Sequence, residues 1–132
     1  VGCSTALPLG EAAPEFSRPF AESDIDPDVV FYFGESVLLP EYRGRGIGHA
    51  FFDQREAFAL GMGRFRLTAF CAIDRPPDHP RRPPDYQPLD PFWEKRGYRR
   101  QPHLFARFSW KEVDELAETA KQLTFWTREL PA

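Results

Sequence analysis

Proline is the feature that most limits the folds open to this 132-residue chain. The sequence holds 14 prolines, which is about twice the average usage of roughly 5%. Half of them gather in one stretch, as Pro76, Pro77, Pro80, Pro83, Pro84, Pro88 and Pro91. Proline lacks an amide hydrogen and has a fixed φ, so neither a helix nor a central strand tolerates that density. We therefore predict a long, stiffened loop over residues 75–88 between two structured halves.

Composition and charge are those of a soluble globular protein. Hydrophobic residues make up 42% of the chain and charged residues 28%. A net charge of -3 argues against generic nucleic-acid binding, which needs a net basic face. We find no apolar run of membrane-spanning length, and two cysteines are too few for a disulfide framework. We expect one domain over residues 1–132 in the cytoplasm, with no membrane or nucleic-acid partner.

The first half alternates strand and helix signals. A continuous apolar run over residues 29–39 predicts a central strand covered on both faces. From Ile47 onward, a helix with one apolar face is predicted by the spacing of Ile47, Ala50, Phe51 and Phe58. The elements expected in this half are a strand over 1–9, a helical turn around 11–16, the strand over 29–39, a helix that stops at Gly61 and a strand over 65–74. Strand, glycine turn, helix and strand in that order predict two adjacent parallel strands.

The second half begins with a short helix over residues 90–96. Asp90 is placed to cap that helix, Pro91 suits its first position, and Gly97 ends it. Strand patterns follow over 103–110 and 122–129. We predict a short connector between these strands, with a possible helical turn.

Three glycines, Gly44, Gly46 and Gly48, lie between the predicted strand over 29–39 and the helix behind it. Backbone N–H groups left uncovered by glycine, together with a helix N-terminus, form a phosphate-binding turn. Their G-x-G-x-G spacing differs from the dinucleotide pattern G-x-G-x-x-G, and no Walker lysine follows. The turn is therefore either a phosphate site of another kind or a tight turn that serves close packing alone.

The segment Val37–Gly48, VLLPEYRGRGIG, resembles the acetyl-CoA-binding motif of the GNAT acetyltransferase superfamily. That motif, R/Q-x-x-G-x-G/A, falls on Arg43, Gly46 and Gly48. A second family signature, aromatic-aromatic-x-x-x-Gly-aromatic, is matched by residues 92–98, FWEKRGY. The resemblance covers residues 29–98 and implies an α/β fold with a mixed, largely antiparallel central sheet, flanking helices and a splayed strand pair for CoA. It also implies that the family's opening strand, two helices and second strand are missing from this chain.

By this resemblance the chain is an N-acetyltransferase. It would transfer acetyl from acetyl-CoA to a primary amine of a small molecule or peptide by direct attack, with no metal. The turn would bind the CoA pyrophosphate through backbone N–H groups, and the strand before it would bind the pantetheine arm. The implied cofactor-binding residues are Val37, Leu38, Leu39, Arg43, Gly44, Arg45, Gly46, Ile47 and Gly48. An apolar sheet edge left by the missing strands would make a homodimer possible.

Two features concern catalysis. In many family members the second aromatic of the second signature is a tyrosine that protonates the CoA thiolate. Trp93 stands there instead, which leaves Tyr86 or Tyr98 as substitutes. Glu35 stands out in an apolar strand, so it is either a solvated or ion-paired residue or the base that takes the amine proton. Trp93 also keeps open a second function, a non-catalytic acyl-CoA-binding or protein-interaction domain.

Overall fold

A computed structural model describes residues 2–73, 89–110, 116–117 and 119–131. The predicted loop over 75–88 therefore lies outside the described residues. The helices and strands are β1 (Gly2–Pro8), α1 (Pro14–Glu22), β2 (Val30–Leu38), α2 (Ile47–Met62), β3 (Leu67–Ile73), α3 (Asp90–Lys95), β4 (Arg99–Trp110) and β5 (Thr119–Glu129). Short 3-10 turns occupy Leu9–Glu11, Pro27–Val29 and Pro40–Tyr42.

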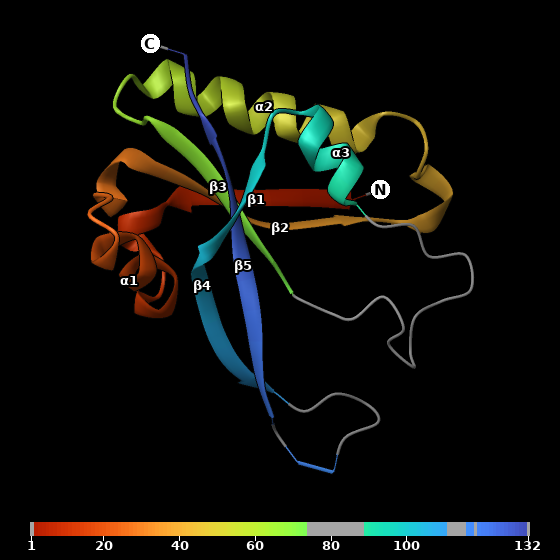
Figure 1. Cartoon of the computed structure of the whole chain (residues 1–132). Coiled ribbons are helices and arrows are strands. Elements are labelled where there is room, and N and C mark those ends of the chain that lie inside the picture. Colours follow the sequence, from red (N-terminus) through yellow and green to blue (C-terminus); the bar gives the residue numbers. More distant parts are fainter. Residues whose placement is uncertain (1, 74–88, 111–115, 118, 132) are drawn as a thin grey trace.

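The described strands form one sheet in the order β1-β2-β3-β5-β4. Strands β2 and β3 are parallel, whereas β1 with β2, β3 with β5 and β4 with β5 are antiparallel. The predicted mixed, largely antiparallel sheet is confirmed, and so is the parallel pair on either side of the glycine turn. The chain crosses from β2 to β3 through α2, which lies along one face of the sheet (Figure 1).

Helices cover both faces of the sheet. Helices α2 and α3 lie on one face, and α1 lies on the other (Figure 1). A hydrophobic core lies on each face of the sheet. Alternate residues of β2 pack in the two cores, because successive strand side chains point to opposite faces. The α1 side holds Leu9, Phe20, Val30, Tyr32, Ala69, Leu104, Ala106 and Phe125. The α2 side holds Phe31, Phe33, Phe52, Ala59, Phe65, Phe70, Tyr98 and Trp126.

Helix α1 is longer than the predicted turn around residues 11–16. Pro14 occupies its first turn, where a missing amide hydrogen costs nothing. Phe16 and Phe20, four residues apart, share one face and pack on the sheet. Their ring centroids lie 5.0 Å from Tyr32 and 4.8 Å from Phe125, respectively. Tertiary burial of two aromatics therefore stabilises a helix that the local proline content argues against.

Helix α2 differs from the prediction in its end and in its buried face. The helix was predicted to stop at Gly61, but it ends at Met62. Gly63, with φ +75°, adopts the left-handed conformation that ends the helix. Its buried residues are Phe52, Arg55 and Ala59. Phe58, assigned to the core face by its spacing, is 60% exposed. The sequence offers two apolar stripes on this helix, and the buried one includes an arginine.

The remaining boundaries shift by a few residues. Asp90 is the first residue of α3 rather than its cap, which is Leu89. Gly97 ends α3 as predicted, with φ +90° and its N–H donating to the Glu94 carbonyl at 3.0 Å. Strands β4 and β5 begin earlier than predicted, at 99 and 119. Most of the predicted connector lies outside the described residues. None of the described helices combines the length and apolar character needed to cross a bilayer.

We expect the chain to self-associate. Strand β1 is an edge strand of the sheet that the described residues form, and α2 exposes Phe58 and Met62 at 60% and 48%. Unpaired strand edges and exposed apolar side chains both favour association. Sedimentation velocity should show concentration-dependent dimers or larger species, reduced in Phe58→Asp but unchanged in Gln54→Asp, an exposed position on the same helix. A monomer over a wide concentration range would contradict this expectation.

Candidate functional site

A split between the two parallel strands is the main feature of the site. Strands β2 and β3 pair only at Val30 with Leu67, Phe31 with Thr68 and Tyr32 with Ala69. Beyond this point β2 continues to Leu38 and β3 to Ile73 with no pairing between them, and the two ribbons diverge (Figure 1). Past Tyr32, therefore, the edge of β2 that faces β3 carries main-chain groups without a strand partner among the described residues. The splayed strand pair predicted for this fold is present.

The exposed half of β2 leads out of this split. Residues Val30 to Phe33 are buried, whereas Gly34 to Val37 are exposed. The predicted strand covered on both faces is therefore correct only for its first half. Val37 and Leu39 are 54% and 48% exposed, so they form an apolar surface beside the split. Glu35 is also exposed, so the cost of burying a carboxylate no longer argues for a function of this residue.

The glycine turn follows β2 directly. Gly44 and Gly46 have φ of +77° and +80°, the left-handed region that favours glycine. A Cβ at either position would meet no atom within 4 Å, so the backbone conformation rather than crowding selects glycine. Gly46 is the N-cap of α2 and supplies no side-chain cap, which leaves the first-turn N–H groups open to a ligand. Arg43 and Arg45 are exposed beside them.

Charge and shape at this turn suit an anion. The N-terminus of the 16-residue helix α2 carries a positive partial charge, and its first turn contains no acidic residue. Ile47 and Gly48 belong to this first turn. Packing against α3 does not itself require glycine at position 48, because a Cβ there would lie 3.7 Å from the Phe92 ring, an ordinary contact distance. The structure thus brings the predicted cofactor-binding residues together along β2, the turn and the first turn of α2.

The aromatic residues of the second signature are structural. Trp93 packs against Phe70 and Trp126, at ring-centroid distances of 4.8 and 5.0 Å. Tyr98 is 1% exposed, and its hydroxyl donates to Glu56 Oε2 at 2.8 Å and contacts Thr68 Oγ1 at 2.8 Å. Burial raises the pKa of Tyr98 above its ordinary value. Tyr98 is therefore held in the core and is not placed to protonate a cofactor, while Tyr86 lies outside the described residues.

Glu56 links three elements of this region. Its Oε1 accepts from Arg96, the C-cap of α3, at 2.7 Å and from Arg128 of β5 at 3.0 Å. Arg96 also bonds Asp53 at 2.7 Å and His49 Nδ1 at 3.2 Å. Burial opposes the charge of Arg96, but its hydrogen bonds to Asp53 and Glu56 outweigh burial and raise its pKa. The network fixes α3 and the N-terminal half of α2 against β5.

Replacing Glu56 with glutamine should destabilise the fold strongly. The Glu56 and Arg96 side chains are both 12% exposed, so the change leaves a largely buried guanidinium with only the exposed Asp53 as a carboxylate partner. We expect a loss of about 3 kcal/mol in the free energy of unfolding. Asp53→Asn serves as control and should cost less than about 1 kcal/mol, because Asp53 is 66% exposed. Urea unfolding measures both; equal small losses would show that the network does not stabilise the fold.

A tyrosine and a cysteine meet at the closed end of the split. Tyr32 of β2 and Cys71 of β3 face each other, with the hydroxyl 3.4 Å from Sγ. Burial raises the pKa of the Tyr32 hydroxyl and that of the Cys71 thiol. A protonated thiol is a weak nucleophile, so Cys71 acts here as a half-buried packing residue. The other cysteine, Cys3, is exposed and free.

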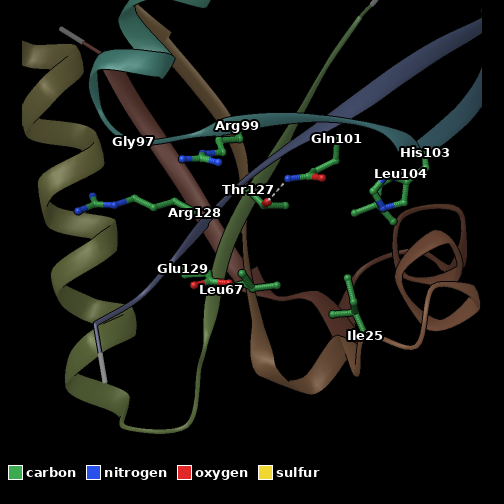
Figure 2. A pocket seen from close by; sticks show the side chains of 10 residues that line it. All are labelled: Ile25, Leu67, Gly97, Arg99, Gln101, His103, Leu104, Thr127, Arg128 and Glu129. Atoms are coloured by element: carbon green, nitrogen blue, oxygen red, sulfur yellow. Dashed lines mark hydrogen bonds between the residues drawn. The ribbon is translucent and has the colours of Figure 1, made fainter.

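A separate pocket of about 660 Å³ lies beside the ends of several strands of the sheet (Figure 2). The residues that line it are Ile25, Leu67, Gly97, Arg99, Gln101, His103, Leu104, Thr127, Arg128 and Glu129. It sits where β3 begins and β5 ends, opposite the open end of the split, and none of the predicted cofactor-binding residues lines it. Apart from Gly97, the sequence patterns did not single out these residues as a site. Within the described ranges, no three His, Cys, Asp or Glu side chains are grouped to hold a metal ion.

Comparison with solved structures agrees with this geometry. No protein-family model and no curated protein matches the sequence. In structure, the chain is similar to a GNAT-family acetyltransferase of Desulfovibrio desulfuricans, at a TM-score of 0.58 and 12% identity. It is also similar to NAA60 of Arabidopsis thaliana, solved with a bisubstrate analogue, with a TM-score of 0.56 and 13% identity. Another similar structure is that of MesI, a CoA-dependent acyl-homoserine lactone synthase, with a TM-score of 0.53 and 13% identity. The chain thus has the GNAT acetyltransferase fold.

The matches cover nearly all of this chain but only part of each neighbour. They include 98%, 97% and 99% of this chain, respectively. They span 61%, 62% and 57% of the neighbouring chains. The chain therefore corresponds to about three fifths of the length of these proteins.

Proposed function

We propose that this chain is a GNAT-type acyltransferase domain that binds acetyl-CoA in the β2–β3 split and transfers the acetyl group to a primary amine. The observation that carries the proposal is the continuity of the split with the glycine turn. Pairing of β2 with β3 stops at Tyr32, and β2 then runs on to Leu38, close before the turn that precedes α2. One extended ligand with an apolar arm and a phosphate end fits this path.

Each part of the path has a distinct role in binding. Main-chain groups of Val37, Leu38 and Leu39 would bond the pantetheine arm, since this edge of β2 has no strand partner in the described sheet. The pyrophosphate would bind at the backbone N–H groups of Gly44, Gly46, Ile47 and Gly48. Arg43 and Arg45 would add charge beside it.

The proposed chemistry is direct attack of an amine on the thioester carbon. Glu35, directly or through a water, would take the ammonium proton, so that the neutral nitrogen attacks. Backbone N–H groups near Leu38 and Leu39 would donate to the carbonyl oxygen as it becomes an oxyanion. Attack forms the carbon–nitrogen bond; collapse of the tetrahedral intermediate restores the carbonyl, breaks the carbon–sulfur bond and releases the CoA thiolate, and the nitrogen loses its second proton to solvent. Trp93 offers no suitable proton, so we propose that the thiolate leaves unprotonated or takes its proton from solvent.

A second candidate is a domain that binds acyl-CoA without catalysis. The observation in its favour is that the described residues place no tyrosine hydroxyl where the family's acid would act. Trp93 is packed in an aromatic core, and Tyr98 is buried and bonded to Glu56. This alternative keeps the cofactor path and drops the transfer step.

Two assays on the same sample separate these functions. Calorimetry measures binding of CoA, and release of free thiol from acetyl-CoA with a panel of primary amines measures transfer. We expect CoA to bind and thiol to appear in an amine-dependent way. Binding without thiol release would favour the non-catalytic alternative, and absence of both would reject the CoA site altogether.

A further inference from the structure

A β-bulge in β2 marks the place where β2 leaves β3. Strand β1 pairs Ala6 with Phe33 and Ser4 with Ser36, so Gly34 and Glu35 both lie opposite Thr5. The last pair between β2 and β3, Tyr32 with Ala69, lies one residue before this bulge, with Phe33 between them. A bulge bends its strand and increases the local twist. Its position explains why β2 turns away from β3 while it stays paired with β1.

Thr5 completes the hydrogen bonding of the bulge. An extra residue in a bulge leaves a backbone amide outside the ladder. Here the Glu35 N–H donates to Thr5 Oγ1 at 2.9 Å. Gly34 leaves room for this hydroxyl, because a Cβ at Gly34 would lie 2.7 Å from Thr5 Oγ1. The threonine side chain and the glycine are thus fitted to each other.

Arg55 of α2 holds Thr5 from the helix side. Its Nη1 donates to the Thr5 carbonyl at 3.2 Å, and its Nε donates to the Phe51 carbonyl at 3.3 Å. The guanidinium carbon lies 4.3 Å from the Phe33 ring centroid and 5.1 Å from that of Phe52. These contacts join α2, β1 and β2 at the bulge.

The burial of Arg55 points to a specific role. The residue is 8% exposed, and it forms no ion pair within the described part of the chain. Burial lowers its pKa, although the nearby Tyr98 and Glu56 act in the opposite direction. An apolar residue of similar size often replaces a buried charge at no loss of stability. Core packing alone therefore does not account for an arginine at this position.

We propose that Thr5 and Arg55 are positioning residues for acyl transfer, an inference that rests on the proposed function. Thr5 fixes the Glu35 amide, and Arg55 fixes Thr5. The bulge held in this way sets the opening of the split for the pantetheine arm and the place of the Glu35 carboxylate beside it. Neither side chain needs to touch the cofactor, since both act through the backbone of β2.

The test compares four variants with the parent. Thr5→Val and Arg55→Met remove the two contacts, Thr5→Ser keeps the hydroxyl, and Ser4→Ala changes the neighbouring position outside the bulge. Three quantities are measured: Kd for CoA, the pH profile of thiol release from acetyl-CoA with the amine panel, and NMR hydrogen exchange of the Glu35 amide. Exchange reports the contact with no cofactor present.

Thr5→Val and Arg55→Met should each weaken CoA binding about fivefold, alter the pH profile and speed exchange at Glu35. Thr5→Ser and Ser4→Ala should behave as the parent. If Thr5→Val does not fold, Gly34→Ala displaces the same hydroxyl and should give the same changes. Variants with a lower Tm but with the parent's Kd and pH profile would show a merely structural role and overturn the inference. A parent that binds no CoA would instead refute the proposed function, and the positioning role with it.

Discussion

Gly46→Val should lower CoA affinity about tenfold or more. Gly46 has φ +80°, and forcing a side chain into the left-handed region costs roughly 1–2 kcal/mol for an ordinary residue. Valine would either displace the turn or place its branched side chain in the open space beside the first N–H groups of α2. Both outcomes keep the pyrophosphate from reaching the backbone N–H groups of the turn. Calorimetric titration with CoA measures the change.

Gly63→Val is the matched control. Gly63 has φ +75° and open space around its Cβ position, like Gly46, but it caps the opposite end of α2. Backbone strain should therefore lower the Tm of both variants similarly, while only Gly46→Val loses affinity for CoA. Equal affinity in the parent and in Gly46→Val would contradict the assignment of this turn. Equal loss in both valine variants would point to helix destabilisation instead.

Glu35→Gln should reduce the rate of thiol release about 100-fold with CoA affinity unchanged. A primary ammonium has a pKa near 10, so only a small fraction of the amine is neutral at pH 7. Glutamine keeps the size and hydrogen bonding of glutamate and removes its basicity. The neutral fraction shrinks as pH falls, so the loss should be largest at low pH. Initial rates across pH with one amine from the panel measure the effect.

A structural role for the Glu35 carboxylate would give a different result. It would lower the Tm of Glu35→Gln and leave the shape of the pH profile intact. Glu35 is exposed, so we expect little change in Tm. Should the variant keep the parent's rate and profile, Glu35 is not the base, and proton removal belongs to solvent or to another group.

Local patterns predicted most of the sheet. The apolar run over 29–39, the glycines at 44, 46 and 48 and the alternation over 65–74 predicted β2, the turn, α2 and β3 with the correct parallel pairing. These signals are strong because each lies within a few neighbouring residues. Helix α1 was predicted only as a turn, because its stability comes from Phe16 and Phe20 against the sheet.

The candidate site was predicted only where it is local in sequence. The turn and the strand before it are contiguous, so the glycine spacing and the family resemblance pointed to them as a candidate site. The contact of Thr5 with Glu35 spans 30 residues and that of Arg55 with Thr5 spans 50. A bulge of this kind depends on the register between two strands, which composition and periodicity do not contain. The predicted apolar face of α2 did not include Arg55, which the structure buries with Phe52 and Ala59.

Hydrogen exchange with and without CoA tests the central claim most directly. The account predicts slower exchange, on addition of CoA, in the two segments that border the split and the turn, residues 34–38 and 44–50. It predicts no change around the separate pocket, at residues 99–104 and 127–129, which belong to the far end of the sheet (Figure 2). Protection confined to that pocket, or absent from both segments of the split, would contradict a CoA site between β2 and β3.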